Sequence, residues 1–195
     1  MRLFTAQRDE GSADEIWLLE HPPVFTLGLG ADPGHVFNPG VIPVVSTERG
    51  GQASYHGPGQ LVAYVLVDLA RRGLLVRELV RHLEEACIAC LAACGIEAER
   101  RHRAPGVYVR SGPQAGAKIA ALGLKIRRGC SYHGLALNVA MDLQPYQRIH
   151  PCGVAKLPVT DMYSCLRWAP AIEDLAPRLG HRIAAQLDRC LAQAQ

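Results

Sequence analysis

Hydrophobic and polar positions along the chain predict a series of short strands. Apolar or β-branched runs bounded by glycine, proline or polar residues predict strands at 16–21, 24–28, 41–46, 61–68 and 106–110. Residues 118–126 alternate between two sets of side chains, and the turn 127–130 leads into residues 132–141. These last two segments are therefore expected to pair as a hairpin.

Helical spacing of apolar residues predicts two long helices. The first covers residues 74–95 and ends at Gly95, with a repeating stripe formed by Val76, Leu79, Val80, Leu83, Cys87, Cys90, Leu91 and Cys94. The second covers about residues 172–192, with Leu175, Leu179, Ile183, Leu187 and Leu191 on one face. Pro177 lies near the start of the second helix, and Gly180 is a candidate break within it.

Hairpins and helices are mixed along the chain rather than in regular alternation. This order predicts the α+β class, an α/β mixed sheet that is largely antiparallel, with helices packed against it. A length of 195 residues is that of one ordinary domain, and no low-complexity linker divides the chain. We therefore expect a single domain over residues 1–195.

Composition excludes several classes of protein. The chain is 49% hydrophobic and 20% charged, which is a globular rather than a disordered composition. No apolar run approaches the roughly 20 residues that span a bilayer, and residues 1–15 contain no apolar signal core. The net charge of +3 and 6% aromatic residues do not favour nucleic-acid binding. We expect a cytoplasmic protein with neither a membrane nor a nucleic acid as partner.

The cysteines are expected to be reduced thiols. Seven is an odd number, and no signal peptide precedes them. Cys87 and Cys90 have the spacing of a redox or zinc pair, but both fall on the apolar stripe of the first helix, and no second ligand pair stands at zinc spacing. We interpret them as core residues and expect no metal.

Three segments carry candidate chemistry, each with a plainer alternative. Residues 48–60 are rich in glycines and polar side chains and lie between two predicted strands. They form either a ligand-binding loop or a simple glycine turn. They lack the pattern of a phosphate-binding loop. Lys118 is one of only three lysines. It is either a catalytic acid or base held against apolar surface, or an ordinary lysine at a strand end whose charged group extends to solvent. Cys152 follows Pro151 and precedes Gly153, on a turn that would expose a reactive thiol.

Two further sets of residues compete for roles in catalysis. Cys130 lies beside two arginines at the predicted hairpin turn and is a rival nucleophile, which electrostatics alone do not exclude. His133 and His150 are candidate bases, although each has an alternative as a hydrogen-bonded turn histidine.

Together, these segments resemble a known enzyme family. RGGQASYHGPGQ at 49–60, APGVYV at 104–109, AKIAALGLKIRRGCSYHGLALNV at 117–139 and HPCG at 150–153 are similar to the octanoyltransferases of lipoate biosynthesis. These lipoyl(octanoyl) transferases are also called lipoate-protein ligase B. The similarity runs in order from about residue 14 to residue 159 and implies the catalytic fold of biotin/lipoate protein ligases.

The resemblance also implies a reaction and its partners. Octanoyl would pass from its thioester on acyl carrier protein to a lysine of a lipoyl domain, as an amide. The acceptors would be the lipoyl domains of 2-oxoacid dehydrogenases and the glycine cleavage H protein. A thioester is already an activated acyl group, so no ATP and no other cofactor is expected.

By resemblance, Cys152 is the nucleophile that forms an acyl-thioester intermediate, and Cys130 is a bystander. Lys118 would favour the thiolate and then shuttle protons. The implied substrate pocket is lined by Arg49, Gly50, Gly51, Gln52, Ala53, Ser54, Tyr55, His56, Ala121, Leu122, Gly123, Gly134, Leu135 and Ala136. The small residues Gly123, Gly134 and Ala136 are expected to leave room for the acyl chain.

Two alternatives and one departure accompany this interpretation. An ATP-dependent lipoate or biotin ligase shares the fold, and a non-catalytic protein that binds acyl carriers would tolerate loss of Cys152 and Lys118. Family members usually carry another strand and the start of a helix ahead of the region that matches residues 4–20. Their apparent absence predicts a less stable fold, with poorer cover over Ile16, Trp17 and Leu18.

Overall fold

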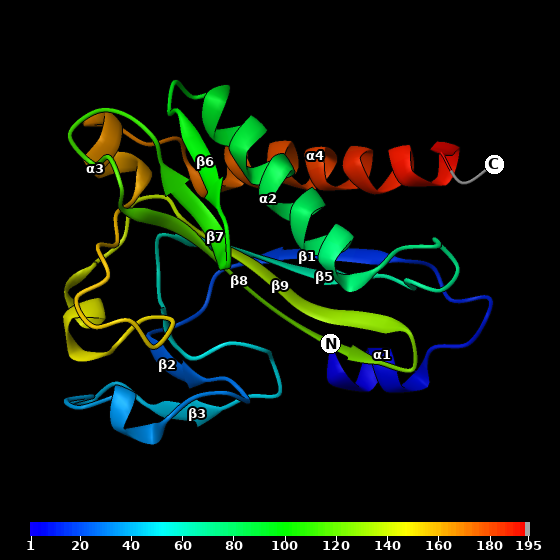
Figure 1. The fold of residues 1–195 in the computed structure, drawn as a ribbon, viewed down its shortest axis with the longest axis horizontal. Helices are drawn as coiled ribbons and strands as arrows, with labels where there is room; N and C mark the ends of the chain where they lie inside the picture. Colours follow the sequence, from blue (N-terminus) through cyan, green and yellow to red (C-terminus); the bar gives the residue numbers. More distant parts are fainter. Residues whose placement is uncertain (194–195) are drawn as a thin grey trace.

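The computed structural model describes the backbone of residues 1–193 and the side chains of residues 1–189. Its larger sheet has six strands in the order β1 (Glu15–Leu19), β5 (Gln60–Leu66), β9 (Cys130–Asn138), β8 (Lys118–Arg127), β7 (Ala104–Val109) and β6 (Ala98–Arg101). Each neighbouring pair in this sheet is antiparallel. The strands β8 and β9 form the expected hairpin, which extends across the molecule (Figure 1).

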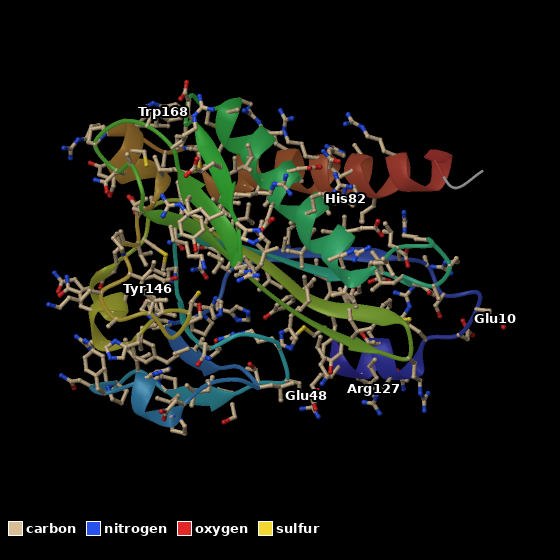
Figure 2. All side chains as sticks on the ribbon, viewed as in Figure 1. Glu10, Glu48, His82, Arg127, Tyr146 and Trp168 are labelled. Atoms are coloured by element: carbon tan, nitrogen blue, oxygen red, sulfur yellow. The ribbon has the colours of Figure 1, made fainter. Side chains whose placement is uncertain are left out.

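A second, smaller sheet lies apart from the first one and contains β3 (Val44–Ser46), β2 (Val24–Leu27) and β4 (Ala53–His56). The β2–β3 pair is parallel and the β2–β4 pair is antiparallel, so the parallel component of the expected mixed sheet lies here. Phe25, Tyr55 and Ile149 form a separate small core behind this sheet. Tyr146 of the short helix η2 (Gln144–Arg148) packs edge-on against Tyr55 (Figure 2).

The two predicted long helices, α2 (Val76–Ala92) and α4 (Ile172–Gln193), lie side by side over one face of the larger sheet (Figure 1). Strand alternation explains how that face is built, because Leu61, Ala63 and Val65 of β5 belong to the core beneath the helices. Val62 and Tyr64 of the same strand point to the opposite face. The helices therefore bury one face of the sheet and leave the other for the site.

The cysteine stripe on α2 is part of this core, as predicted. Cys87 and Cys90 are buried, and burial raises the pKa of both thiols, that of Cys90 to about 11. The other stripe, on α4, buries Leu175, Leu179 and Ile183. The predicted position of Leu191 on this stripe lies outside the side chains that the structure describes, as does Cys190, the last of the seven cysteines.

Gly180 does not break the C-terminal helix, which was a wrong expectation. The helix α4 runs through both Pro177 and Gly180. A Cβ atom on Gly180 would lie 2.9 Å from Leu18 Cδ1, so the glycine allows close packing of the helix on β1. Hydrophobic periodicity did not predict six elements: β4, β6, α1 (Arg2–Gln7), α3 (Met162–Leu166) and the short 3-10 helices η1 (Pro33–His35) and η2.

The N-terminal segment is tied to the sheet through one carboxylate. Asp14 accepts hydrogen bonds from Arg8, Arg71 and Arg72 and from the main-chain N–H of Asp68. Burial acts to raise the pKa of Asp14, but these hydrogen bonds outweigh it and lower the pKa. β1 lies at the edge of the sheet, and Phe4 of α1 packs edge-on against its Trp17.

None of the helices that the structure describes is long and apolar enough to cross a membrane.

Candidate active site

A cavity of about 590 Å³ lies between the smaller sheet and the face of the larger sheet that α2 and α4 leave uncovered. Most of the predicted pocket residues line it: Arg49, Gly51, Gln52, Ala53, Ser54, His56, Ala121, Leu122, Gly123, Gly134, Leu135 and Ala136. Lys118 and Cys152 line the same cavity. Residues as far apart in the sequence as Arg49 and Cys152 therefore meet at one site.

Two predicted pocket residues are placed differently. Gly50 is absent from the lining, and its N–H donates to the Leu124 carbonyl at 2.8 Å. Tyr55 is also absent from the lining, because alternation along β4 turns Ser54 and His56 to the cavity and Tyr55 to the small core. Both residues therefore pack behind the residues that line the cavity and do not face the cavity themselves.

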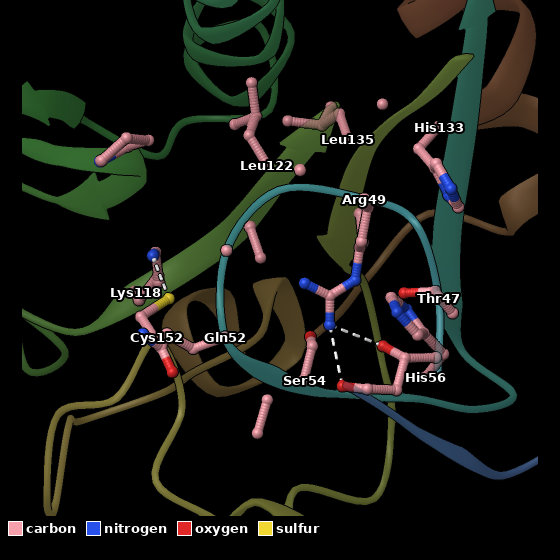
Figure 3. Close-up of a pocket in the computed structure, with 18 of the residues that line it drawn as sticks. Thr47, Arg49, Gln52, Ser54, His56, Lys118, Leu122, His133, Leu135 and Cys152 are labelled. Carbon is pink, nitrogen blue, oxygen red and sulfur yellow. Dashed lines mark hydrogen bonds between the residues drawn. The ribbon is translucent and has the colours of Figure 1, made fainter. Parts of the chain in front are cut away.

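Lys118 and Cys152 are in direct polar contact inside the cavity. Lys118 Nζ lies 2.9 Å from Cys152 Sγ (Figure 3). The two residues are 34 positions apart in the sequence. An ammonium group at this distance stabilises a thiolate, and a neutral amine at the same place accepts a proton from the thiol. Such a pair can act as a nucleophile with its proton acceptor already in contact.

A turn presents the Cys152 sulfur to the cavity. Cys152 has a left-handed φ of 57°, followed by Gly153 at 72°. A non-glycine residue in this region is uncommon and marks a constrained turn. The Cys152 N–H donates to the Ala53 carbonyl of β4 at 3.3 Å, which ties the turn to the smaller sheet.

Lys118 is held at the first position of β8 and is only 4% exposed. Its main-chain N–H donates to Pro158 O at 2.8 Å, and its carbonyl accepts from Thr160 N–H at 3.0 Å. Its ammonium lies 5.3 Å from the centre of the Tyr108 ring, a cation–π contact. The lysine is therefore a fixed component of the cavity wall, and the alternative of a lysine extending to solvent is wrong.

The glycine-rich loop lies against β8. Arg49 donates to the main-chain and side-chain oxygens of Thr26 at 2.8 and 2.7 Å (Figure 3). Burial lowers the pKa of Arg49, while a guanidinium remains charged at any physiological pH. The loop thus places one partly buried positive charge beside the cavity, as a ligand loop would and as a simple turn does not require.

Gly123 and Gly134 have packing roles that differ from the expected one. A Cβ atom on Gly123 would lie 2.9 Å from the Gly50 carbonyl oxygen, and one on Gly134 would collide with the Ala63 carbonyl. Their missing side chains make room for main chain of the glycine loop and of β5. Both glycines also line the cavity, so the expectation that they leave room for an acyl chain stays a prediction.

Three histidines and a tyrosine that the sequence did not group line the cavity: His21, His56, Tyr64 and His133. Burial lowers the pKa of His56 and of His133 to about 4, and it also lowers the pKa of His21. These rings are neutral near pH 7. His133, which was predicted as a candidate base, belongs to the cavity wall, but its low pKa makes it a weak base.

His150 does not face the sulfur as a base. Its ring packs against His35 and Phe37, with ring centres 5.6 and 5.2 Å away. Its main-chain N–H donates to the His35 carbonyl at 2.8 Å. The main chain and the ring packing of His150 thus support the turn before Cys152, but its ring Nδ1 has no hydrogen-bond partner among the described residues, so the expected hydrogen-bonded turn histidine is not seen.

A buried amide network supports the floor of the site. Gln60 is 1% exposed and donates to Asn138 Oδ1 at 2.8 Å and to the Tyr146 hydroxyl at 3.1 Å. Asn138 in turn donates to the Thr160 carbonyl at 2.9 Å, next to the residues that flank Lys118. Gln60 ends the glycine-rich motif, but its partners lie far along the chain, so sequence reasoning had no signal for the network.

Cys130 is separated from the site. It pairs with Arg127 at the far end of the β8–β9 hairpin, nine residues along β8 from Lys118, or roughly 30 Å. It is 7% exposed, and burial together with Asp68 raises the pKa of its thiol. The geometry thus favours Cys152 over Cys130 as the nucleophile.

Among the side chains that the structure describes, no group of three or more His, Cys, Asp or Glu residues has the arrangement of a metal site.

Comparison with known proteins identifies the family. The family model of the lipoyl protein ligase A/B catalytic domain matches residues 1–184. The chain belongs to this family. It is 60% identical over 162 residues to an octanoyltransferase of Ralstonia pickettii, covering 83% of this chain and 71% of that protein. It is 56% identical over 196 residues to an octanoyltransferase of Burkholderia lata, covering 100% and 77%.

Solved structures share the fold of this family member at low identity. A bipartite lipoate protein ligase of Thermoplasma acidophilum has a TM-score of 0.75 at 18% identity, over 96% of this chain and 76% of that one. A lipoate-protein ligase A bound with ATP has a TM-score of 0.70 at 18% identity, over 96% and 78%. The predicted lipoate ligase-like fold is confirmed, and the relatives' names identify the chain as a transferase of octanoyl groups in lipoate synthesis.

Proposed function

We propose that this protein moves octanoyl from acyl carrier protein to a lipoyl-domain lysine through a thioester on Cys152. The observation that carries the proposal is the 2.9 Å contact between Lys118 Nζ and Cys152 Sγ inside the cavity. Covalent acyl transfer requires a thiolate nucleophile and a neighbouring group that donates and accepts protons.

In the first step, the Cys152 thiolate attacks the carbonyl carbon of the donor thioester. The new C–S bond forms, the old C–S bond breaks, and the carrier's sulfur leaves with the proton of the Lys118 ammonium. One thioester replaces another, so the step is close to balanced in free energy. No ATP is consumed, because the donor arrives activated.

In the second step, the acceptor lysine attacks the acyl-enzyme as a neutral amine. Lys118, now deprotonated, removes the proton that the attacking nitrogen sheds as the amide forms. The Cys152 sulfur leaves as a thiolate beside the regenerated ammonium. The same pair is therefore ready for another donor.

The cavity suits a medium-length acyl chain. Its wall includes Val62, Leu122, Leu135 and Leu157. Burying methylene groups against such side chains contributes about 0.8 kcal/mol each. The acyl chain would bind along this wall with its thioester at Cys152.

Acyl carrier protein as donor, and the lipoyl domains of 2-oxoacid dehydrogenases and the glycine cleavage H protein as acceptors, complete the proposal. We place the reaction in the cytoplasm. The described cysteines are all unpaired thiols, in keeping with a reducing compartment.

Peptide mass spectrometry after incubation with octanoyl-acyl carrier protein tests the proposal. We expect a mass increase of one octanoyl group on the peptide that contains Cys152. Cys130→Ser serves as the matched control and should acylate normally, whereas Cys152→Ser should not. A label on Cys130 together with an active Cys152→Ser variant would overturn the assignment.

Two further measurements separate the proposed function from its alternatives. Conjugation of free octanoate in the presence of ATP and magnesium, without acyl carrier protein, would identify an ATP-dependent ligase. Binding of the carrier without any acylation, unaffected by loss of Cys152 or Lys118, would identify a non-catalytic carrier-binding protein.

A further inference from the structure

The Lys118 side chain passes over a glycine of the neighbouring strand. Gly106 of β7 has a φ of 129°, which side chains rarely adopt. A Cβ atom there would collide with Lys118 Cε and would lie 3.0 Å from Lys118 Nζ and 2.7 Å from the Ala120 carbonyl. The missing side chain of Gly106 is therefore the space that the end of the lysine occupies.

An irregular register produces this crossing. Val107 pairs with Ala120, but the next residue, Tyr108, pairs with Lys118, so one residue of β8 is skipped. A bulge of this kind changes the direction of nearby side chains. It brings the lysine across β7 and onto Gly106.

A buried carboxylate holds Gly106 from the other side. Glu84 of α2 accepts a hydrogen bond from the Gly106 N–H at 2.8 Å. Glu84 is 6% exposed and extends from the helix layer to the strand. A carboxylate is costly to bury, and one that binds a single main-chain N–H fixes that peptide strongly.

Charged groups surround this carboxylate. Burial raises the pKa of Glu84, whereas the Gly106 N–H and the positive charges of Arg100 and Lys118 oppose the shift, and Glu85 adds to it. The Lys118 ammonium lies in contact with Cys152 Sγ and over the Tyr108 ring, within electrostatic reach of Glu84.

We propose that Glu84 is a positioning residue, which holds the Gly106 main chain in place and thereby keeps Lys118 Nζ in contact with Cys152 Sγ. This inference rests on the proposed function in taking Lys118 and Cys152 as the reacting pair. Displacement of a catalytic group by about 1 Å can cost a hundredfold in rate. A carboxylate behind the pair that contacts no substrate would therefore control both steps.

Alkylation of Cys152 by iodoacetamide tests this inference without any acyl donor. The reagent reacts with the thiolate, so the rate on the Cys152 peptide, followed by mass spectrometry against pH, reports how well Lys118 supports the thiolate. Because no octanoyl group is involved, this assay can contradict the role of Glu84 without contradicting the proposed octanoyl transfer, and the reverse also holds.

Glu84→Ala removes the acceptor, and Glu84→Gln keeps an acceptor oxygen without the charge. The measured quantity is the alkylation midpoint, the pH at which the alkylation rate of Cys152 reaches half its maximum. We expect this midpoint to rise by about one pH unit in Glu84→Ala, because the lysine is held less firmly. In Glu84→Gln the midpoint should stay near the wild-type value. The matched control is Glu85→Ala, which removes the adjacent carboxylate and should leave the midpoint unchanged. Thermal melting of each variant establishes that it is folded.

A glycine pair provides a second measurement. Gly106→Ala places a methyl group where Lys118 lies, and Gly112→Ala introduces similar backbone strain at φ 84° where nothing lies within 4 Å. The midpoint should rise in Gly106→Ala and stay fixed in Gly112→Ala. A folded Glu84→Ala protein with the wild-type midpoint would overturn the inference, and so would Glu84→Gln behaving like Glu84→Ala.

Discussion

The Gly50 carbonyl oxygen lies 2.9 Å from the point where a Cβ atom on Gly123 would stand. Main chain of the glycine-rich loop therefore rests directly on β8, and the width of the cavity depends on that contact. A methyl group at position 123 must push the loop, with Arg49 on it, away from the strand.

Gly123→Ala should therefore impair substrate binding more than chemistry. We expect kcat/KM for octanoyl-acyl carrier protein to fall about tenfold through KM, with the Lys118–Cys152 pair intact. Gly11→Ala, on an exposed turn with its nearest neighbour atom at 3.7 Å, is the control. Wild-type kinetics in Gly123→Ala would show that the loop moves without consequence.

Lys118→Arg should separate the two steps of the reaction. Arginine keeps a positive charge beside the thiolate but does not give up its proton near neutral pH. Acylation of Cys152 should persist and transfer to the lipoyl domain should collapse, so the acyl-enzyme accumulates. Single-turnover measurements follow its formation and decay separately.

Lys118→Ala should lose both steps, with acylation partly restored at high pH where the thiolate forms unaided. Transfer by Lys118→Arg at the wild-type rate would reduce the lysine to an electrostatic partner. Normal acylation and transfer by both variants would exclude the proposed pair.

Acid should destabilise the fold through the cavity histidines. Burial lowers the pKa of His56 from an ordinary value of 6.5 to about 4. Between these values the unfolded chain binds a proton that the folded chain does not, so stability falls as pH decreases through this window. For His56 the loss reaches about 2 kcal/mol at pH 5.

Urea unfolding of His56→Gln at pH 7 and pH 5 measures this contribution. The difference between the two pH values should shrink by about that amount, since glutamine does not titrate. His102→Gln, at an exposed position, should retain the wild-type difference. An unchanged difference in His56→Gln would mean that other groups cause the acid sensitivity.

Asp14→Ala should weaken the attachment of the N-terminal segment. Three arginines converge on this carboxylate, and its removal leaves the largely buried Arg8 without its counter-charge. We expect a loss of about 3 kcal/mol in unfolding free energy. Glu97→Ala, which breaks an exposed pair with Arg110, should cost less than about 1 kcal/mol. Equal losses in the two variants would contradict this account.

Periodicity predicted the core well, because burial and helical spacing are local properties. The stripe on α2, the β5 strand and the β8–β9 hairpin all follow from neighbouring residues. It missed β4, whose Ala53–His56 segment lies among glycines and polar residues that are typical of a loop. That strand is stabilised by pairing with β2, a contact between distant segments.

The site shows the same division. Lys118 and Cys152 were each singled out by residue type and by their flanking residues, and the resemblance linked them. The contact of Gly106 with Lys118, and the hydrogen bond from Gly106 to Glu84, arise from a register shift between β7 and β8. No pattern within either strand indicates such a shift, so these supporting residues could not be predicted from the sequence.

The helices α2 and α4 cover one face of the larger sheet, and Cys152 lines the cavity at the other face. In the proposed reaction, two carrier proteins must use the same sulfur in turn, so the donor departs before the acceptor arrives. The octanoyl group then remains bound to Cys152 as an acyl-enzyme until an acceptor binds. The fraction of capped cysteine would reflect the balance between supply of acyl donor and demand from unmodified lipoyl domains. A capped sulfur is also unable to form a sulfenic acid, so abundant donor would protect the enzyme from oxidative inactivation.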